Sequence, residues 1–319
     1  SVYYGGVFND DINLLGHNLI YRGGVGSDVF LVKTNIVGQI EWAKSWGGKS
    51  VDHITSITVN GGIVYAAGYF SDTLYVENDT LFNNGQIAAF IIAYDTTGNY
   101  IKSFSPDAYN LKISNIDISL DNQLLITGQY FQYANLGGQS FLSQNGYNYF
   151  LLKYDLWSNQ LGWFKESNGN NTKGKKIAQD SFGNIYICGI YGLNAIIDGN
   201  VLPNDNGNHN TFIAKYNNNG VLTWIKTIQG NGEVHGYGLD VTPEGQSFIT
   251  GEFENSITSD NSPFLTSVGL FDVFIVSFDS SGNIIWGKSY GGFNNDIPRS
   301  LGLPLAIEFG KKIITVGYE

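Results

Sequence analysis

The chain has 319 residues, of which 42% are hydrophobic and only 14% are charged, so it carries enough apolar material for a large folded core. Its formal net charge is −11 and its arginines are limited to Arg22 and Arg299, which excludes a basic surface for nucleic acid. The single cysteine, Cys188, excludes an internal disulfide framework, and no apolar run approaches the ~18 residues that would insert into a membrane.

The first predicted elements lie in residues 1–23. The Tyr-Gly-Gly triplet at 4–6 matches the Trp-Gly-Gly triplet at 46–48 and a second Tyr-Gly-Gly triplet at 290–292. This match predicts that residue 1 lies at the end of the fourth strand of a repeat. A shortened unit without a long insertion then follows, with two strands near 12–15 and 19–23.

The next element, a strand at 28–33 with a central Phe, begins a clear repeat. Strands of the same kind follow at intervals of 60 to 62 residues, and their central residues are Phe30, Phe90, Phe150, Phe212 and Phe274. Self-similarity at a fixed period indicates an architecture built from stacked units.

A strand with a central Trp follows four of these Phe strands after a polar turn rich in Gly and Asn. The recurring residues are Trp42, Trp163, Trp224 and Trp286, while the second unit has the segment 100–103 without a Trp. A buried Trp removes ~150–250 Å² from water, so we expect these side chains to pack one unit against the next.

An apolar strand that ends in Gly completes the pattern and recurs at 64–68, 125–128, 186–189, 248–251 and 314–317. The second unit then contains four predicted strands, near 54–59, 63–69, 89–94 and 100–104. The turns between them combine Asn or Asp with Gly, and none of the runs has the periodicity of a helix. The predicted class is therefore all-β.

Four antiparallel strands cannot bury both faces of their own sheet, so successive units must pack face to face around an axis. The pattern resembles SBBP repeats, a β-propeller repeat family found in many secreted and surface proteins. The resemblance rests on Gly68-Tyr69-Phe70, the Asp-x-Phe-x-x-Lys strand, the Gly-Asn turn, and the segments 42–48 and 286–292. It covers essentially the whole chain and implies a β-propeller of four-stranded antiparallel blades.

The repeat predicts one propeller domain over residues 1–319, with units at approximately 1–48, 49–105, 106–167, 168–229, 230–291 and a partial unit at 292–319. Such a ring is usually closed by a blade that both termini complete. The C-terminus offers the first two strands of that blade and the N-terminus a fourth. We predict six blades with an incomplete composite blade; seven blades in a longer parent chain is the alternative.

Motifs that carry chemistry are missing from the sequence. No two of the histidines lie at a metal-ligand spacing on one element; they are His17, His53, His209 and His235. A nucleophile elbow, a phosphate loop and a His-Glu-x-x-His motif are absent. Cys188 occupies the place of Ala67, Thr127 and Thr250, which indicates a small buried residue. We therefore expect a protein that is not an enzyme, with no catalytic residues, no metal ligands and no cofactor.

Acidic side chains recur in the connection between the fourth strand of one unit and the first strand of the next. These connections gather on one face of a propeller, around the mouth of its channel. The candidate binding residues for a cation, a sugar or a basic peptide are therefore Asp11, Asp52, Glu233 and Asp296. The alternative is that each carboxylate accepts hydrogen bonds from nearby backbone amides and supports its own loop.

The insertions between the second and third strands vary most in sequence; they cover roughly 71–88, 131–148, 192–210 and 253–271. Variable loops on a constant scaffold are where recognition usually resides. The alternative is that the insertions cover a sheet edge. Segment 204–209 superficially resembles a calcium loop but lacks its final acidic residue. Glycosylation sequons begin at Asn78 and Asn170.

Three functions remain open at this point. The leading hypothesis is a non-catalytic scaffold for protein interaction, adhesion or assembly on a surface or particle, outside the cell, that binds a protein or glycan through its loops. The first alternative is a lectin-like propeller, because Tyr, Trp, Asn and Asp suit sugar faces and hydroxyls. The second is a hydrolase that uses the rim carboxylates as acid and base. The oligomeric state is left open.

Overall fold

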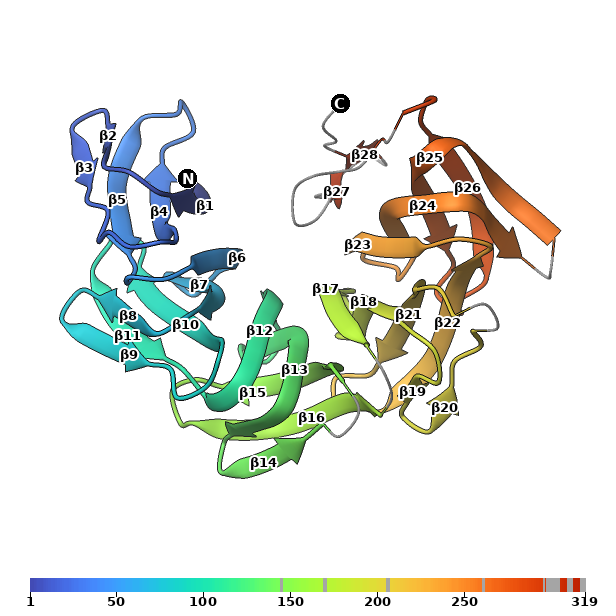
Figure 1. Ribbon diagram of the computed structural model, residues 1–319, viewed down its shortest axis with the longest axis horizontal. Helices are drawn as coiled ribbons and strands as arrows, with labels where there is room; N and C mark the ends of the chain where they lie inside the picture. Colours follow the sequence, from blue (N-terminus) through green and yellow to red (C-terminus); the bar gives the residue numbers. More distant parts are fainter. Residues whose placement is uncertain are drawn as a thin grey trace. The chain divides into compact units, whose positions relative to one another are not determined.

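In the computed structural model the chain folds into strands joined by turns and short loops (Figure 1). The structure describes residues 1–143, 146–168, 171–204, 207–259, 262–294, 296, 305–308 and 312–315. Within these ranges there is no helix, and the predicted all-β class is confirmed. A helix long and apolar enough to cross a membrane is accordingly not found in the described ranges.

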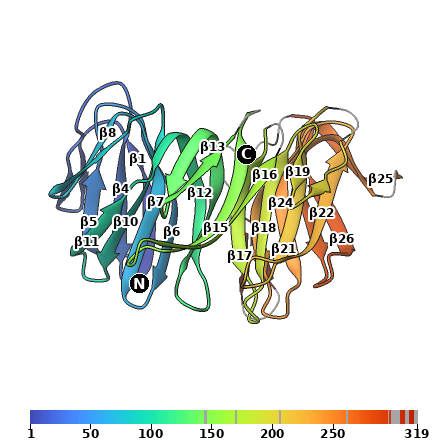
Figure 2. The same cartoon turned by 90° about the horizontal axis from the view of Figure 1, so that it is seen from below.

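The second repeat shows the basic unit. Its sheet has the order β11-β10-β7-β6, and neighbouring strands are antiparallel (Figure 2). The strands are β6 (Asp52–Asn60), β7 (Ile63–Phe70), β10 (Ala88–Asp95) and β11 (Tyr100–Phe104). All four coincide with predicted strands, because their alternation of apolar residues and their Gly/Asn turns specify a hairpin register locally.

The next three repeats have the same order of strands. The third contains β12 (Asp107–Ile118), β13 (Leu124–Leu136), β15 (Asn148–Asp155) and β16 (Gln160–Asn168). The fourth contains β17 (Lys173–Gln179), β18 (Ile185–Tyr191), β21 (Asn210–Tyr216) and β22 (Leu222–Gly230). The fifth contains β23 (Val234–Val241), β24 (Ser247–Ser259), β25 (Ser262–Phe278) and β26 (Ile284–Tyr290). Beyond them, β27 (Leu305–Glu308) pairs with β28 (Lys312–Thr315), where the first two strands of a sixth unit were predicted.

The start of the chain differs from the prediction. Strand β1 (Val2–Phe8) pairs with β4 (Asp28–Thr34), which pairs with β5 (Ile40–Trp46), so β1 is the second strand of the first repeat and not the end of a fourth strand. The Gly-Gly pair in residues 1–8 fits either the end of a fourth strand or the end of a second strand. Gly6 lies opposite Phe30 and the ring of Phe30 packs on it, which identifies β1 as a second strand. The segments predicted as blade strands form the small hairpin of β2 (Ile12–Leu14) and β3 (His17–Leu19). The first repeat therefore does have an insertion.

Contacts divide the chain into two compact units. The first contains Ser1–Leu124, Tyr130–Gln144 and Trp157–Gln160, and the second contains Leu125–Gln129, Asn145–Leu156 and Leu161–Glu319. The core of the first unit is aromatic and includes Trp46, Phe70, Phe90 and Tyr94. The second unit buries a similar set around Tyr186, Phe212, Phe253 and Phe274. The single propeller domain and the number of blades stay predictions.

Three of the four recurring Trp residues connect consecutive repeats, as expected. Their indole N–H groups donate to a carbonyl in the turn between the third and fourth strands of the following repeat: Trp42 to Thr96 (3.2 Å), Trp163 to Asn218 (3.1 Å) and Trp224 to Ser280 (3.1 Å). A lysine from the neighbouring strand donates to the same three carbonyls, from Lys33, Lys153 and Lys215. In the second repeat Ala93 and Lys102 occupy the places of this lysine and tryptophan.

The insertions also connect consecutive repeats. In the second repeat the insertion is a hairpin of β8 (Thr73–Val76) and β9 (Asp79–Phe82), and Tyr75 forms a bridge with Gly47 of the first repeat. In the fourth repeat β19 (Ile196–Ile197), which pairs with β20 (Asn200–Val201), extends β16 of the third repeat. In the fifth repeat Ile257 and Thr258, near the end of β24, similarly pair with β22. The first strand of each of these insertions thus covers the edge of the preceding sheet.

Candidate functional site

The candidate site lies in the second unit, where the fourth and fifth repeats meet. His209 directly precedes β21, Glu233 directly precedes β23, and His235 is the second residue of β23. The two strand starts are held together because the backbone N–H of Val234 donates to the carbonyl of His209 (2.9 Å). Two histidines that are distant in the sequence are thereby brought onto one carboxylate.

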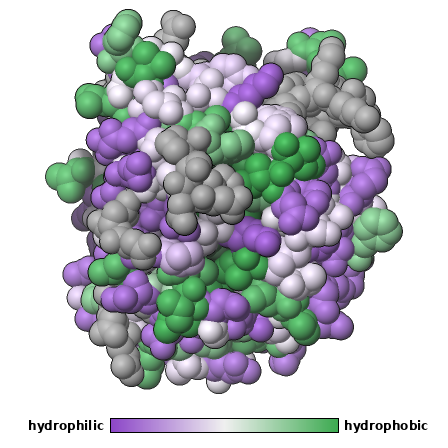
Figure 3. All heavy atoms as spheres, turned by 90° about the vertical axis from the view of Figure 1, so that its right-hand side faces the viewer, coloured by the Kyte–Doolittle hydropathy of each residue, from purple (hydrophilic) through white to green (hydrophobic). Residues whose placement is uncertain are grey.

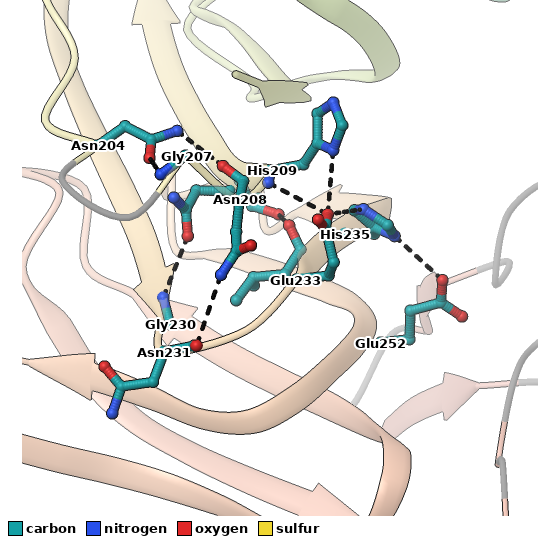
Figure 4. Close-up of polar contacts among 12 residues, drawn as sticks. Asn204, Gly207, Asn208, His209, Gly230, Asn231, Glu233, His235 and Glu252 are labelled. Carbon is teal, nitrogen blue, oxygen red and sulfur yellow. Dashed lines mark hydrogen bonds and ion pairs between the residues drawn. The ribbon is translucent and has the colours of Figure 1, made fainter. Parts of the chain in front are cut away.

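Glu233 is at the centre of this cluster (Figure 4). Its Oε2 lies 3.0 Å from Nδ1 of His209 and 2.9 Å from Nε2 of His235, and it accepts the backbone N–H of His209 (3.1 Å). The three side chains are partly exposed, so a small solute can reach them. The two nitrogens and the carboxylate oxygen all lie within 4.8 Å of one another.

Glu252 approaches His235 from the opposite side of the ring. Its Oε1 lies 3.2 Å from Nδ1 of His235 and accepts a hydrogen bond from the Tyr237 hydroxyl (2.8 Å). Burial raises the pKa of Tyr237, with a smaller contribution from the charge of Glu252, so the phenol stays protonated and donates. The Glu252 side chain is only 8% exposed, and its Oε2 has no hydrogen-bond partner within the described part of the chain.

The imidazole of His235 therefore faces a carboxylate at each nitrogen. A neutral imidazole has one N–H and can donate to one carboxylate only, so the arrangement is satisfied either by an imidazolium or by a cation beside one nitrogen. Two imidazole nitrogens and a carboxylate oxygen form a donor set suited to zinc and related divalent ions. The cluster can thus hold either a proton or a metal ion.

This cluster was not predicted from the sequence, because its ligands are not spaced along one element. The signal was available in the alignment of repeats, since equivalent backbone bonds run from Asp52 to Ser27 and from Val234 to His209. That register places His209 and Glu233, which directly precedes Val234, at neighbouring strand starts. His235 aligns with His53, which stacks on the ring of Tyr69 (centroids 5.2 Å apart).

The four predicted rim carboxylates all accept a backbone N–H. Asp11 accepts from Tyr21 (2.8 Å) and lies in the first insertion, and Asp52 accepts from Gly48 (2.8 Å); both belong to the first unit. In the second unit, Asp296 accepts from Gly292 (2.6 Å) and Glu233 from His209. These bonds fit the alternative in which each carboxylate supports its own loop. A binding role for them stays a prediction.

Asp52 is fully buried beside a second buried carboxyl group, Asp28. Asp28 accepts the backbone N–H of Arg22 (2.9 Å), and its Oδ2 lies 3.7 Å from the Arg22 guanidinium. Burial, with a smaller contribution from the charge of Asp28, raises the pKa of Asp52 to about 8 against the opposing hydrogen bond from Gly48. Gly47 is required here, because a Cβ at this position would lie 2.2 Å from Cγ of Asp28. Gly291 and Asp272 repeat this close approach, at 2.3 Å.

The segment that resembles a calcium loop forms hydrogen bonds of its own. The Asn204 side chain donates to the carbonyl of Asn208 (2.7 Å) and accepts the N–H of Gly207 (3.1 Å), which ties Asn204 to the two residues before His209 (Figure 4). Residues 205 and 206 of that segment, and Asn170 of the predicted sequon, lie outside the described residues.

Comparison with known proteins supports the repeat. Residues 156–189 match SBBP, a beta-propeller repeat, which confirms the resemblance seen in the sequence. A search of curated proteins found no match.

The chain is also similar to solved structures. It resembles hydrazine synthase from Kuenenia stuttgartiensis, with 13% identity and a TM-score of 0.37 over 79% of this chain and 70% of that one. It resembles xylan beta-1,4-xylosidase from Bacillus halodurans, with 12% identity and a TM-score of 0.37 over 88% of this chain and 55% of that one. A third similar structure is a variant of the GH43 protein BlXynB from Bacillus licheniformis, with 13% identity and a TM-score of 0.35 over all of this chain and 60% of that one. The chain thus spans little more than half the length of the latter two proteins.

Proposed function

We propose that this chain is a non-catalytic β-propeller-repeat scaffold that binds a partner protein through the insertions between its second and third strands. One observation carries the proposal: four of the insertions each place a large apolar side chain in solvent. These side chains are 67% to 85% exposed and belong to Leu15, Phe82, Leu142 and Val201. In several insertions the first strand pairs with the preceding repeat, so the exposed side chains on the second strand are left for recognition.

Burial of such a side chain at an interface contributes about 1.5–3 kcal/mol before the cost of association is subtracted. Single exposed apolar residues are common on protein surfaces, and on the face in Figure 3 they are interspersed with hydrophilic ones. Phe82, Leu142 and Val201 recur at the same place, as the last residue of the second strand of their insertion hairpins, and Leu15 lies in the turn of the first insertion. This recurrence favours a recognition site. By analogy with the secreted and surface proteins that this repeat resembles, we place the scaffold outside the cell.

The test compares two sets of serine substitutions in the full chain. The first set is Phe82→Ser, Leu142→Ser and Val201→Ser in the insertions. The matched control changes apolar residues of equal exposure at the turns at the other end of the strands, namely Val37→Ser and Phe182→Ser. In cross-linking and pull-down from the source organism, the insertion variant should lose the captured partner while the control retains it. Equal capture by both variants, with unchanged melting temperatures, would overturn the proposal.

A further inference from the structure

We propose that His209, Glu233 and His235 bind one divalent metal ion of the zinc class, and that Glu252 orients His235 for this role. The ligands would be Nδ1 of His209, Oε2 of Glu233 and Nε2 of His235. This donor set leaves at least one coordination position open to solvent or to a partner. The site is independent of the exposed apolar residues of the insertions and of the scaffold function proposed above.

A bound cation would resolve an unfavourable contact at His235. His235 faces Oε2 of Glu233 at one nitrogen and Oε1 of Glu252 at the other, at 2.9 Å and 3.2 Å. When Nδ1–H donates to Glu252, the lone pair of Nε2 points at a carboxylate oxygen, which is repulsive. A cation between Nε2, Oε2 and the Nδ1 of His209 turns that repulsion into three favourable bonds.

Glu252, which lies outside the ligand set, also favours a metal ion. A histidine that binds a metal nearly always donates its other ring N–H to a carboxylate or carbonyl, which fixes the ring and raises its basicity. Glu252 is placed for this, directly opposite His235 in the β23–β24 ladder, and Tyr237 holds the same carboxylate oxygen. Its second oxygen is buried without a partner in the described ranges, a cost for which loop support gives no reason.

The repeat itself does not need these residues to fold. The backbone hydrogen bond from Val234 to His209 has equivalents in other repeats, from Asp52 to Ser27 and from Thr172 to Tyr147. In the second repeat the ladder position of His235 and Glu252 is filled by His53 and Tyr69, which stack. The same backbone is therefore built without two histidines on one carboxylate.

The experiment is a titration of the chelator-treated 319-residue chain with Zn²⁺ by calorimetry and with Co²⁺ by visible absorption. We expect one equivalent of metal to bind, and Co²⁺ to show the d–d bands of a site with nitrogen and oxygen ligands. His209→Ser, which installs the residue found at the same place in the first repeat, and Glu233→Gln should each weaken binding by at least about tenfold. Glu252→Gln keeps the shape of the side chain and should weaken it by about 10–100-fold.

The matched control is His53→Gln, which removes the histidine at the equivalent position of the second repeat and should leave Zn²⁺ affinity unchanged. Far-UV circular dichroism and melting temperature without metal separate lost ligands from lost folding. The proposal is overturned if the native chain binds no stoichiometric metal. It is also overturned if His53→Gln weakens binding as much as the folded His209→Ser and Glu233→Gln variants do. Neither result bears on capture of the partner protein.

Discussion

Gly68 lies directly opposite Phe90 in the ladder between β7 and β10, and the phenyl ring covers the glycine so closely that a Cβ there would lie 2.8 Å from Cζ. The same pairing joins Gly6 to Phe30, Gly189 to Phe212 and Gly251 to Phe274. An aromatic ring that packs on a strand glycine in the next strand stabilises that pair. The strand glycine and the central phenylalanine therefore recur at the same spacing, because they contact each other in each of these repeats.

Gly68→Ala tests this contact. The added methyl group would meet both the ring of Phe90 and, at 1.9 Å, the backbone carbonyl of His53, so the sheet has to shift. We expect a loss of about 2–4 kcal/mol in the free energy of unfolding, measured by urea denaturation. The control is Gly61→Asn, at a turn with φ +56° and no atom within 4 Å of the added Cβ, which should cost less than about 1 kcal/mol. Equal losses in the two variants would contradict the explanation.

Trp42 should contribute through both packing and its hydrogen bond to the next repeat. It is 8% exposed and donates to Thr96. Trp42→Ala is expected to lower the free energy of unfolding by about 3–5 kcal/mol, because it leaves a cavity between two repeats. Trp42→Phe should keep most of the packing and lose about 1 kcal/mol with the hydrogen bond. Phe182→Ala, at an exposed turn, should stay within about 0.5 kcal/mol. A similar small loss for Trp42→Ala would show that the indole does not join the repeats.

The raised pKa of Asp52 predicts a pH dependence. An unfolded Asp has a pKa of about 3.9, whereas Asp52 keeps its proton in the folded state up to about pH 8. Between these values the folded state binds more protons than the unfolded state, so stability falls as pH rises from about 4 to about 8 and then levels off. Asp52→Asn cannot ionise and retains an acceptor for Gly48. The melting temperature of this variant should therefore fall less than that of the native chain between pH 5 and pH 8. Identical slopes would mean that Asp52 is ionised in the fold.

Cys188 should be unreactive in the native state. It is fully buried, and burial raises its pKa to about 12, so little thiolate exists at neutral pH. We expect alkylation at pH 8 to be at least ~100-fold slower in the native chain than in urea. Cys188→Thr, which installs the residue found at 127 and 250, should cost less than about 1.5 kcal/mol. Rapid labelling of the native chain would show that β18 opens locally.

The strands were largely predictable because each is specified by residues close to it. In the second repeat the turns at 60–63 and 95–99 fix two hairpins, and the four strands follow to within two residues. The first eight residues were misplaced because their Gly-Gly pair fits two positions of the repeat. Only the packing of Phe30, which lies on another strand, distinguishes the two.

The His209–Glu233–His235 cluster was not predictable by local reasoning because its members lie on different repeats. Each residue alone has an ordinary explanation as a side chain in a loop or at the start of a strand. Their proximity depends on the bond between Val234 and His209, a long-range feature that appears only when the repeats are aligned on their strand starts. Of the predicted carboxylates, Glu233 belongs to this cluster. Asp52 is instead buried, where it accepts the backbone N–H of Gly48.

The bond from Trp42 to Thr96, like those from Trp163 and Trp224, always runs from one repeat to the one that follows it. Duplication or deletion of a whole sixty-residue segment preserves every such donor and acceptor pair, whereas an exchange that begins inside a segment separates them. Because each of these hydrogen bonds runs in the same direction along the chain, a complete repeat can be gained or lost without breaking them. Related chains can therefore differ in their number of repeats while keeping the same contacts between consecutive repeats.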